Sequence, residues 1–172
     1  MIKLSDEEKT RGVIASSAGN HAQGVAYPAQ KLGVKSVIVM PKHAPLIKVD
    51  ATRKYGSEVV LYGDDYDEAY KKACQLQKEE GYVFIHPFDD EDVIEGQGSI
   101  GLEVLEEVPD ADIILVPIGG GGLISGIASA AKQINPSIKI IGVEPEGAAS
   151  ATAAINEKKV FELKESNTIA SL

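Results

Sequence analysis

Cysteine and tryptophan are almost missing from this sequence. Cys74 is the single cysteine among 172 residues, and there is no tryptophan. One cysteine cannot form an internal disulfide, and a metal cluster built on cysteine would need further thiols that the sequence lacks. Cys74 lies in YKKACQLQKEEG, a run typical of a helix, so we interpret it as a packing residue.

Long hydrophobic runs and an excess of basic charge are missing as well. The longest apolar runs, such as DIILVPI, are far shorter than the roughly 20 residues that cross a membrane as a helix. The start of the chain also lacks the basic-then-apolar pattern of a signal peptide. With 17 basic and 26 acidic residues the net charge is −9, which disfavours nucleic acid and anionic membranes as partners. We therefore expect a cytoplasmic protein that binds neither.

Short apolar runs alternate with longer amphipathic ones from Gly12 onward, in a chain that is 44% hydrophobic and 25% charged. The short runs are rich in Val and Ile and predict buried strands at GVIAS (12–16), SVIVM (36–40), EVVLY (58–62), YVFIH (82–86), DIILVPI (112–118) and KIIGVE (139–144). The amphipathic runs predict helices over 20–32, 44–55, 65–80, 92–107, 122–134 and 147–157. This alternation predicts an α/β protein with open parallel sheets and helices on both faces, a three-layer αβα arrangement.

A break in packing is predicted near EEVPDAD, where Pro109 stands among acidic residues. Residues 12–108 would then form a small αβα domain of four βα units, and residues 109–172 part of a larger domain. Residues 1–11 resemble a helix that ends before the first strand.

Three of the predicted strands end in unusual loops, and ligands of open α/β sheets bind at the carboxyl ends of strands. The loops are SSAGNHAQG (16–24), HPFDD (86–90) and GGGG (119–122). The loops PKHAP and GDDYD, which follow the second and third strands, look like ordinary caps and turns. The three unusual loops therefore mark the predicted site.

The four consecutive glycines Gly119 to Gly122 need an explanation, because each costs about 0.5–1 kcal/mol relative to alanine in regular structure. A tight strand-to-helix turn is one interpretation, although one or two glycines suffice for a turn. The other is a phosphate cradle, in which unhindered N–H groups converge at a helix N-terminus. It is not a P-loop, since no lysine follows the last glycine.

A dinucleotide site is a rival interpretation of the same loop. Gly120, Gly122 and Gly126 spell G-x-G-x-x-x-G, and Glu144 ends the next strand, where a ribose-binding acid stands in such folds. The alternative function is thus an NAD(P)-binding Rossmann domain of an oxidoreductase.

The motifs SSAGNHAQG, GQGSIGLE and VPIGGGGLISG, in this order on alternating βα units, resemble those of the pyridoxal-phosphate-dependent threonine and serine dehydratases. These threonine ammonia-lyases belong to the tryptophan-synthase-β-like superfamily, fold type II. The resemblance extends from about Leu4 to Ala170, through FIHPFDD, GLEVLEEVPDAD and IGVEPEGA. It implies a lyase of amino-acid metabolism, such as isoleucine biosynthesis, that eliminates water from L-threonine or L-serine to give a 2-oxo acid and ammonia.

The resemblance also implies pyridoxal 5'-phosphate as cofactor, an amino acid as small-molecule substrate and, for 109–172, part of the cofactor-binding domain. Open sheet edges in addition predict a homo-oligomer. In the family a G-G-G-G-L loop holds the cofactor phosphate, which here corresponds to Gly119, Gly120, Gly121, Gly122 and Leu123. An S-x-G-N-H loop holds the substrate carboxylate and the cofactor ring oxygen, which here corresponds to Ser17, Ala18, Gly19, Asn20 and His21. Asn20 would face the ring oxygen. His21 has a second interpretation, as a first-turn helix residue that packs beneath the loop.

One position bears on the reaction. Racemases of this family resemble S-S-G-N-H, whose second serine can act as a base on the cofactor face opposite the lysine. Here that position is Ala18, which cannot move a proton. Elimination is therefore favoured over racemisation.

The Schiff-base lysine of the family lies in an S-F-K-x-R-G-like motif, and this chain contains none. Lys3 and Lys9, in a polar segment, are poor substitutes. Relatives read T-I-A-D-G where this chain has TIASL, so Ser171 and Leu172 depart from the pattern. We expect a fragment truncated at both ends, with no catalytic residue of its own and little or no dehydratase activity. A non-catalytic folding or assembly module is the alternative.

Two acidic positions have competing interpretations. Some relatives bind a divalent cation through a Glu, a backbone carbonyl four residues on and an Asp two further, which here would be Glu144, Ala148 and Ser150. Serine lacks the anionic ligand, so a cap on the next helix is favoured for Glu144. Asp89 and Asp90 could form an acidic pair for a metal or for acid–base work, but Asp at a helix start is usually a cap.

Overall fold

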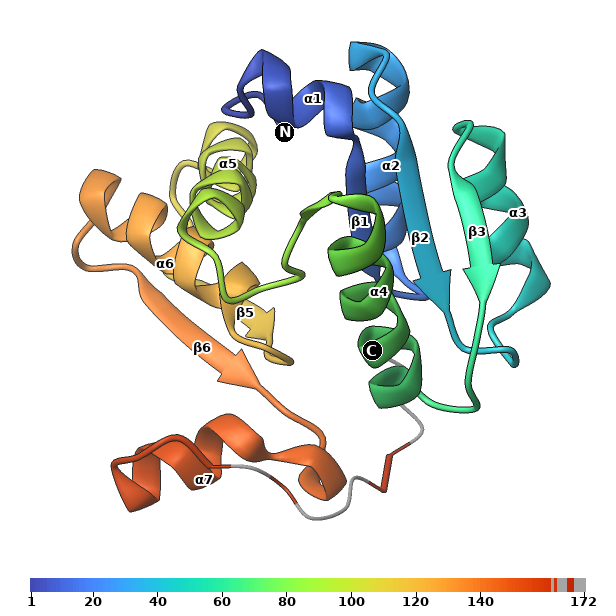
Figure 1. The fold of residues 1–172 in the computed structure, drawn as a ribbon. Coiled ribbons are helices and arrows are strands. Elements are labelled where there is room, and N and C mark those ends of the chain that lie inside the picture. Colours follow the sequence, from blue (N-terminus) through green and yellow to red (C-terminus); the bar gives the residue numbers. More distant parts are fainter. Residues whose placement is uncertain (162, 164–166, 169–172) are drawn as a thin grey trace. The chain divides into compact units, whose positions relative to one another are not determined.

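The structure of the chain is a computed structural model, which describes residues 1–161, 163, 167 and 168 (Figure 1). The chain divides into two compact units, Met1–Pro87 and Phe88–Leu172. The division falls before the helix that precedes Pro109, whereas the predicted boundary falls after it. The domain organisation predicted from the sequence stays a prediction.

The first unit is a four-stranded parallel sheet with strands in the order β3-β2-β1-β4. Its strands are β1 (Val13–Ser16), β2 (Ser36–Met40), β3 (Glu58–Leu61) and β4 (Val83–Phe84). Its helices are α1 (Asp6–Arg11), α2 (Asn20–Leu32), α3 (Leu46–Lys54) and α4 (Tyr66–Glu80). Figure 1 shows α4 on one face of the sheet and α2 and α3 on the other.

The core of the first unit explains these two layers of helices. Residues of β1 alternate between the faces: Val13 and Ala15 pack with apolar residues of α2 and α3, and Ile14 packs with Ala69 and Ala73 of α4. All of β1 and β2 is buried, as expected for central strands of a parallel sheet covered on both faces.

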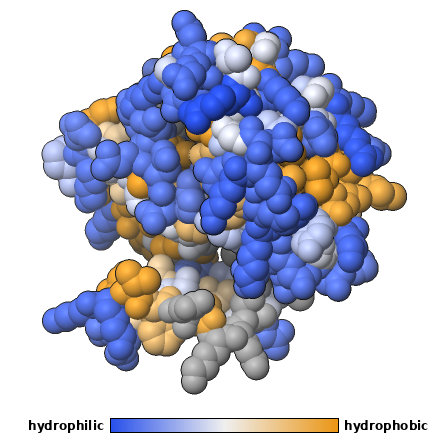
Figure 2. All heavy atoms as spheres, in the orientation of Figure 1, coloured by the Kyte–Doolittle hydropathy of each residue, from blue (hydrophilic) through white to orange (hydrophobic). Residues whose placement is uncertain are grey.

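Not every apolar side chain of this unit is buried. Figure 2 shows hydrophobic side chains gathered at the surface over β3 and α3. Leu46 and Ile47, in the first turn of α3, and Leu61 at the end of β3 are exposed there. Since β3 is an edge strand, it has a neighbouring strand on one side only.

The second unit is built around two parallel strands, β5 (Ile113–Pro117) and β6 (Lys139–Val143). Its helical segments are α5 (Glu91–Glu107), α6 (Gly122–Ile134), the 3-10 turn η1 (Glu146–Ala148) and α7 (Ser150–Glu157). One face of the β5–β6 pair, with Ile114 and Ile140, packs on a cluster of Leu105, Ala131 and Ile138. On the other face Ile113, Leu115, Ile141 and Val143 are exposed.

Helices α5 and α6 approach each other closely because glycines line their contact. A Cβ placed on Gly101 would lie 3.0 Å from the Ile127 carbonyl oxygen, and one on Gly98 would lie 3.4 Å from that of Gly126. A Cβ on Gly126 would in turn lie 2.7 Å from the Gly98 nitrogen. The third glycine of the supposed dinucleotide pattern is therefore used to pack one helix on another.

The α/β class and the parallel sheets are confirmed, and strands and helices follow in the predicted order. Most ends agree to within one residue, and three of the larger differences have local reasons. The third helix begins at Leu46 and not at residue 44, because Pro45 disfavours helical backbone at the residue before it. The strand predicted over 82–86 shortens to Val83–Phe84, which pairs along one side only with β1. The last helix begins at Ser150, after η1. Among the described residues, every helix is too short or too polar to cross a membrane.

Candidate functional site

The loop between β1 and α2 presents the start of a 13-residue helix without a side-chain cap. Ser17 N–H donates to the Val39 carbonyl oxygen over 3.2 Å, which continues the sheet by one residue. Gly19 is the N-cap residue, and α2 begins at Asn20. Gly19 N–H donates to Ser17 Oγ over 3.1 Å. The first turn of α2 therefore keeps N–H groups that no side chain caps, and these favour an anion.

The residues matched to S-x-G-N-H form one continuous turn in the first unit. Ser17, Ala18 and Gly19 are half-buried, whereas Asn20 is exposed. An exposed amide at the first helical position can donate to a ligand placed above the helix start.

His21 is part of the first turn of α2 and is anchored to another strand. Its Nε2 lies 3.1 Å from the Ile85 carbonyl oxygen, so the ring nitrogen must carry the proton and donate. Burial lowers the pKa of His21, and the nearby His86 lowers it further, while the bond to Ile85 acts in the opposite direction. This contact with a backbone carbonyl agrees with the packing interpretation of His21, and its place in the substrate loop stays a prediction.

Ser16 is a feature of this loop that the sequence did not single out. It is the last residue of β1 and fully buried, and its hydroxyl has no hydrogen-bond partner within the described residues. An unsatisfied buried hydroxyl is uncommon. Its signal in the sequence is weak, because a serine before a turn is usual.

The glycine loop between β5 and α6 packs closely against Phe88. Ile118 N–H donates to the Val143 carbonyl oxygen over 2.9 Å, which ends the strand pairing. A Cβ on Gly120 would overlap the Phe88 ring, and one on Gly122 would lie 2.6 Å from the Phe88 carbonyl oxygen. Gly121 is the N-cap of α6 and has φ +88°, a left-handed conformation that favours glycine. Three of the four glycines are thus required by local geometry.

The glycine loop also fits a phosphate group. Its residues, Gly119 to Leu123, form one continuous turn in the second unit and lead into a 13-residue helix without a side-chain cap. Within the described residues, the N–H groups of Gly119, Gly120 and Gly121 donate no hydrogen bond. Unoccupied N–H groups at the positive end of a helix dipole match an anionic ligand.

Glu144 caps the last helix. Its carboxylate accepts from Ala151 N–H and Thr152 N–H, each over 2.8 Å, and from Thr152 Oγ1 over 2.7 Å. Partial burial raises the pKa of Glu144, but the bonds from Thr152 and Ala151 outweigh it and the net pKa is lowered. This confirms the capping interpretation.

The metal site at Glu144 stays a prediction. Ala148 lies in η1 and Ser150 begins α7. In the described part of the chain, no group of three or more His, Cys, Asp or Glu side chains is placed to hold a metal ion.

Asp90 and Lys9 have structural roles at helix ends. Asp90 is the N-cap of α5 and accepts from Asp92 N–H and Val93 N–H over 2.9 and 3.1 Å, which confirms the capping interpretation for Asp90. Lys9 pairs with Asp6 on α1 over 3.3 Å. Cys74 lies half-buried on α4. Ser171 and Leu172 lie outside the described residues.

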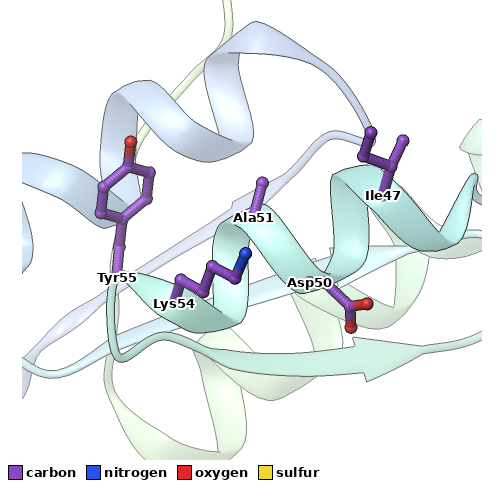
Figure 3. A pocket seen from close by; sticks show the side chains of 5 residues that line it. All are labelled: Ile47, Asp50, Ala51, Lys54 and Tyr55. Atoms are coloured by element: carbon purple, nitrogen blue, oxygen red, sulfur yellow. The ribbon is translucent and has the colours of Figure 1, made fainter.

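A shallow depression of about 310 Å³ lies on α3 (Figure 3). It is lined by Ile47, Asp50, Ala51, Lys54 and Tyr55. None of the residues that the sequence marks as a site lines it, so it adds nothing to the two loops.

Comparison with known proteins gives consistent matches over the whole chain. The family model described as "Pyridoxal-phosphate dependent enzyme" matches residues 1–172. An L-threonine ammonia-lyase of Thermotoga maritima is 50% identical over 167 residues, which cover 97% of this chain and 42% of that protein. The catabolic L-threonine dehydratase TdcB of Escherichia coli K12 is 48% identical over 170 residues, which cover 99% of this chain and 52% of that protein. The chain therefore spans about half the length of these relatives.

Solved structures agree with these matches. The processed form of threonine deaminase isoform 2 from Solanum lycopersicum superposes with a TM-score of 0.91 at 49% identity, covering 96% of this chain and 46% of that one. Maize serine racemase superposes with a TM-score of 0.90 at 43% identity, covering 96% and 50%. Dehydratases and a racemase thus share this fold.

Proposed function

Because this chain belongs to the pyridoxal-phosphate dependent enzyme family, we propose that it carries two ligand-binding loops of a threonine or serine dehydratase. The whole enzyme would be a lyase that eliminates water from L-threonine or L-serine and yields a 2-oxo acid and ammonia. The observation that carries the proposal is the glycine loop, where packing against Phe88 admits only glycine and N–H groups remain available at the start of α6.

The phosphate end of the site would be the turn from Gly119 to Leu123. Its N–H groups would donate to phosphate oxygens, and the dipole of α6 would favour the negative charge. When bound, pyridoxal phosphate supplies an electron sink for the charge left at the substrate Cα after proton loss. The protein supplies orientation.

The carboxylate end would be the turn from Ser17 to Asn20. A substrate carboxylate over the start of α2 would accept from backbone N–H groups and needs no buried cationic side chain. Gly19 N–H already donates to Ser17 Oγ, so the carboxylate would accept from the uncapped N–H groups in the first turn of α2. Asn20 would donate its amide to the ring oxygen of the cofactor, and His21 would hold this turn against β4.

Ala18 supports elimination over racemisation. A methyl group offers no proton donor or acceptor, so Ala18 itself supplies no second base. The Cα proton and the β-hydroxyl would leave the substrate, and hydrolysis of the released product would give the 2-oxo acid and ammonia.

The dinucleotide alternative is not supported. The family model over the whole chain is that of pyridoxal-phosphate enzymes. Gly126 packs against α5, and Glu144 is occupied as the cap of α7. Neither residue is available for the role that the oxidoreductase interpretation gave it.

Further proposals concern the protein as a whole. We propose a homo-oligomer, supported by the open edges of the parallel sheets, and a cytoplasmic location, supported by the single cysteine. We also propose that this chain alone turns over little or no threonine, because it has no motif for the cofactor-bonding lysine. Formation of 2-oxobutanoate from L-threonine by the purified chain would contradict this last proposal.

A titration tests the two-loop proposal directly. Pyridoxine 5'-phosphate has the phosphate and ring oxygen but no aldehyde, so it cannot bond surface lysines. It should shift the backbone amide NMR signals of Gly119 to Leu123, and inorganic phosphate should shift the same set. NAD serves as control. Tighter binding of NAD, or no shift in the glycine loop, would count against the proposed function.

A further inference from the structure

Phe88 contacts no ligand in the proposed function, yet it lies against two residues of the glycine loop. An ideal Cβ on Gly120 would overlap the Cγ, Cδ1 and Cδ2 atoms of its ring. One on Gly122 would lie 2.6 Å from the Phe88 carbonyl oxygen and 2.9 Å from its Cα. The Phe88 ring therefore packs against Gly120, and the Phe88 backbone packs against Gly122. Both contacts lie within the second unit.

The residue between these two behaves differently. A Cβ built on Gly121 would meet no atom within 4 Å, and its backbone is left-handed with φ +88°. The loop thus has a packed side, made by Phe88 at Gly120 and Gly122, and an open side at Gly121. The open side leaves room for a ligand.

Four glycines in a row would be flexible without such support. Glycine loses more conformational freedom on ordering than any other residue, and a site that must bind phosphate through several N–H groups loses affinity when the loop is disordered before binding. Within the described residues the N–H groups of Gly119 to Gly121 have no hydrogen-bond acceptor that would fix them. Packing against Phe88 is the restraint that the structure provides.

We propose that Phe88 is a positioning residue of the phosphate site, whose ring and backbone hold the glycine loop in its binding conformation. The role rests on the proposed function for the identity of the ligand. Phe88 itself makes no contact with phosphate in this proposal, since it occupies the packed side.

Three substitutions at Phe88 separate the effect of the aromatic ring from the effect of side-chain bulk. Phe88→Ala should weaken binding of pyridoxine 5'-phosphate and inorganic phosphate by about tenfold or more, as expected when binding groups lose their alignment. Phe88→Tyr should bind within about twofold of the original, because the atoms against Gly120 are at the Cβ end of the ring and the added hydroxyl is at the far end. Phe88→Leu should fall between them. Equal affinities for the Ala, Tyr and original proteins would overturn the proposal.

A matched control excludes a general loss of stability. Leu105→Ala removes a buried side chain from the core of the same unit, without being among the atoms that meet the glycine loop. It should lower the urea midpoint at least as much as Phe88→Ala while phosphate affinity stays unchanged. If Leu105→Ala weakens phosphate binding as strongly, Phe88 acts only through stability and the proposal fails.

A double-mutant cycle tests the contact itself. Gly120→Ala should weaken binding strongly when the ring is present and much less in the Phe88→Ala background, where the added methyl group has room. Additive effects would show that Phe88 and Gly120 act independently, which contradicts the proposal.

A measurement without ligand keeps this inference separate from the proposed function. The Phe88 ring should produce a ring-current shift on the Gly120 protons, and Phe88→Ala should lower the backbone NMR order parameters of Gly119 to Gly121 from values near those of rigid backbone, about 0.85, to below about 0.6. If the original protein binds no phosphate but these signals appear, the proposed function fails and Phe88 still positions the loop. If the signals are missing, the positioning role is wrong whatever binds.

Discussion

His21 Nε2 donates a hydrogen bond to the Ile85 carbonyl oxygen over 3.1 Å, and so joins the first turn of α2 to the end of β4. Ile85 N–H in turn donates to the Ile14 carbonyl oxygen over 2.9 Å. These two bonds connect the loop that contains Asn20 to the end of β4 and, through Ile85, to β1. Burial of the ring lowers the pKa of His21 and so favours the neutral imidazole.

We predict that acid weakens the fold through His21. Burial lowers the pKa of His21 below its ordinary value of 6.5, so the unfolded chain takes up the proton first. The contribution to stability is complete above about pH 6.5 and is lost as the pH falls toward the folded pKa. Urea unfolding at pH 7.5 and pH 5.5 measures it. His21→Gln keeps a donor for Ile85 and should show a smaller pH difference; an equal difference would exclude His21 as the source.

Glu144→Ala should destabilise the chain by about 1 kcal/mol, because three donors at the start of α7 lose their acceptor. The folded pKa of Glu144 is lowered from 4.5, so this contribution is present above about pH 4.5 and disappears as the pH falls through the folded pKa. Glu144→Gln is the matched control, since it keeps one acceptor oxygen. If Mg²⁺ or Ca²⁺ raises the melting temperature of the original and not of Glu144→Gln, the metal prediction gains support over the cap alone.

Two glycines of α5 should respond oppositely to alanine. A Cβ on Gly101 would lie 3.0 Å from the Ile127 carbonyl oxygen of α6, so Gly101→Ala should cost about 1–3 kcal/mol. A Cβ on Gly96 would meet nothing within 4 Å, so Gly96→Ala should stabilise the helix by up to about 1 kcal/mol. Urea midpoints compare them. Equal effects would mean that α5 and α6 do not pack as closely as the glycines indicate.

Ala18→Ser should add racemisation to elimination in a full-length protein that contains this chain. The new hydroxyl stands where racemases of the family have a second serine, and it can carry a proton. Chiral chromatography of L-serine incubations detects the D-isomer. Ala18→Gly adds no proton carrier and should form none, so D-serine from both variants would assign the second base elsewhere.

Local patterns predicted most of the secondary structure. The helices over 20–32 and 122–134 have the predicted bounds, because Gly33 and the glycine loop mark their ends in the sequence itself. The strand over 36–40 is also as predicted, since a continuous run of apolar residues needs burial on both faces. Other ends differ by a few residues. Pro45 delays the start of α3, and β4 is shorter than predicted.

The contacts that shape the candidate loops could not be predicted in the same way. His21 meets Ile85, and Phe88 meets Gly120, across long stretches of chain whose spacing carries no signal. The loops themselves could be predicted from the sequence, because glycines and small polar residues after a strand lower stability unless they have a function. Their roles in binding remain predictions.

The exposed apolar face of β5 and β6 affects the samples needed for all of these measurements, because it favours self-association. Leu115 keeps 65% of its surface exposed, and Ile113, Ile141 and Val143 lie exposed on the same two strands. Such a surface favours self-association at the concentrations that NMR and calorimetry need. Leu115→Thr and Ile141→Thr would place β-branched residues, which strands prefer, at both positions while removing much of the hydrophobic surface. A sample with these two changes should stay monodisperse longer, and the behaviour of the glycine loop could be followed in it.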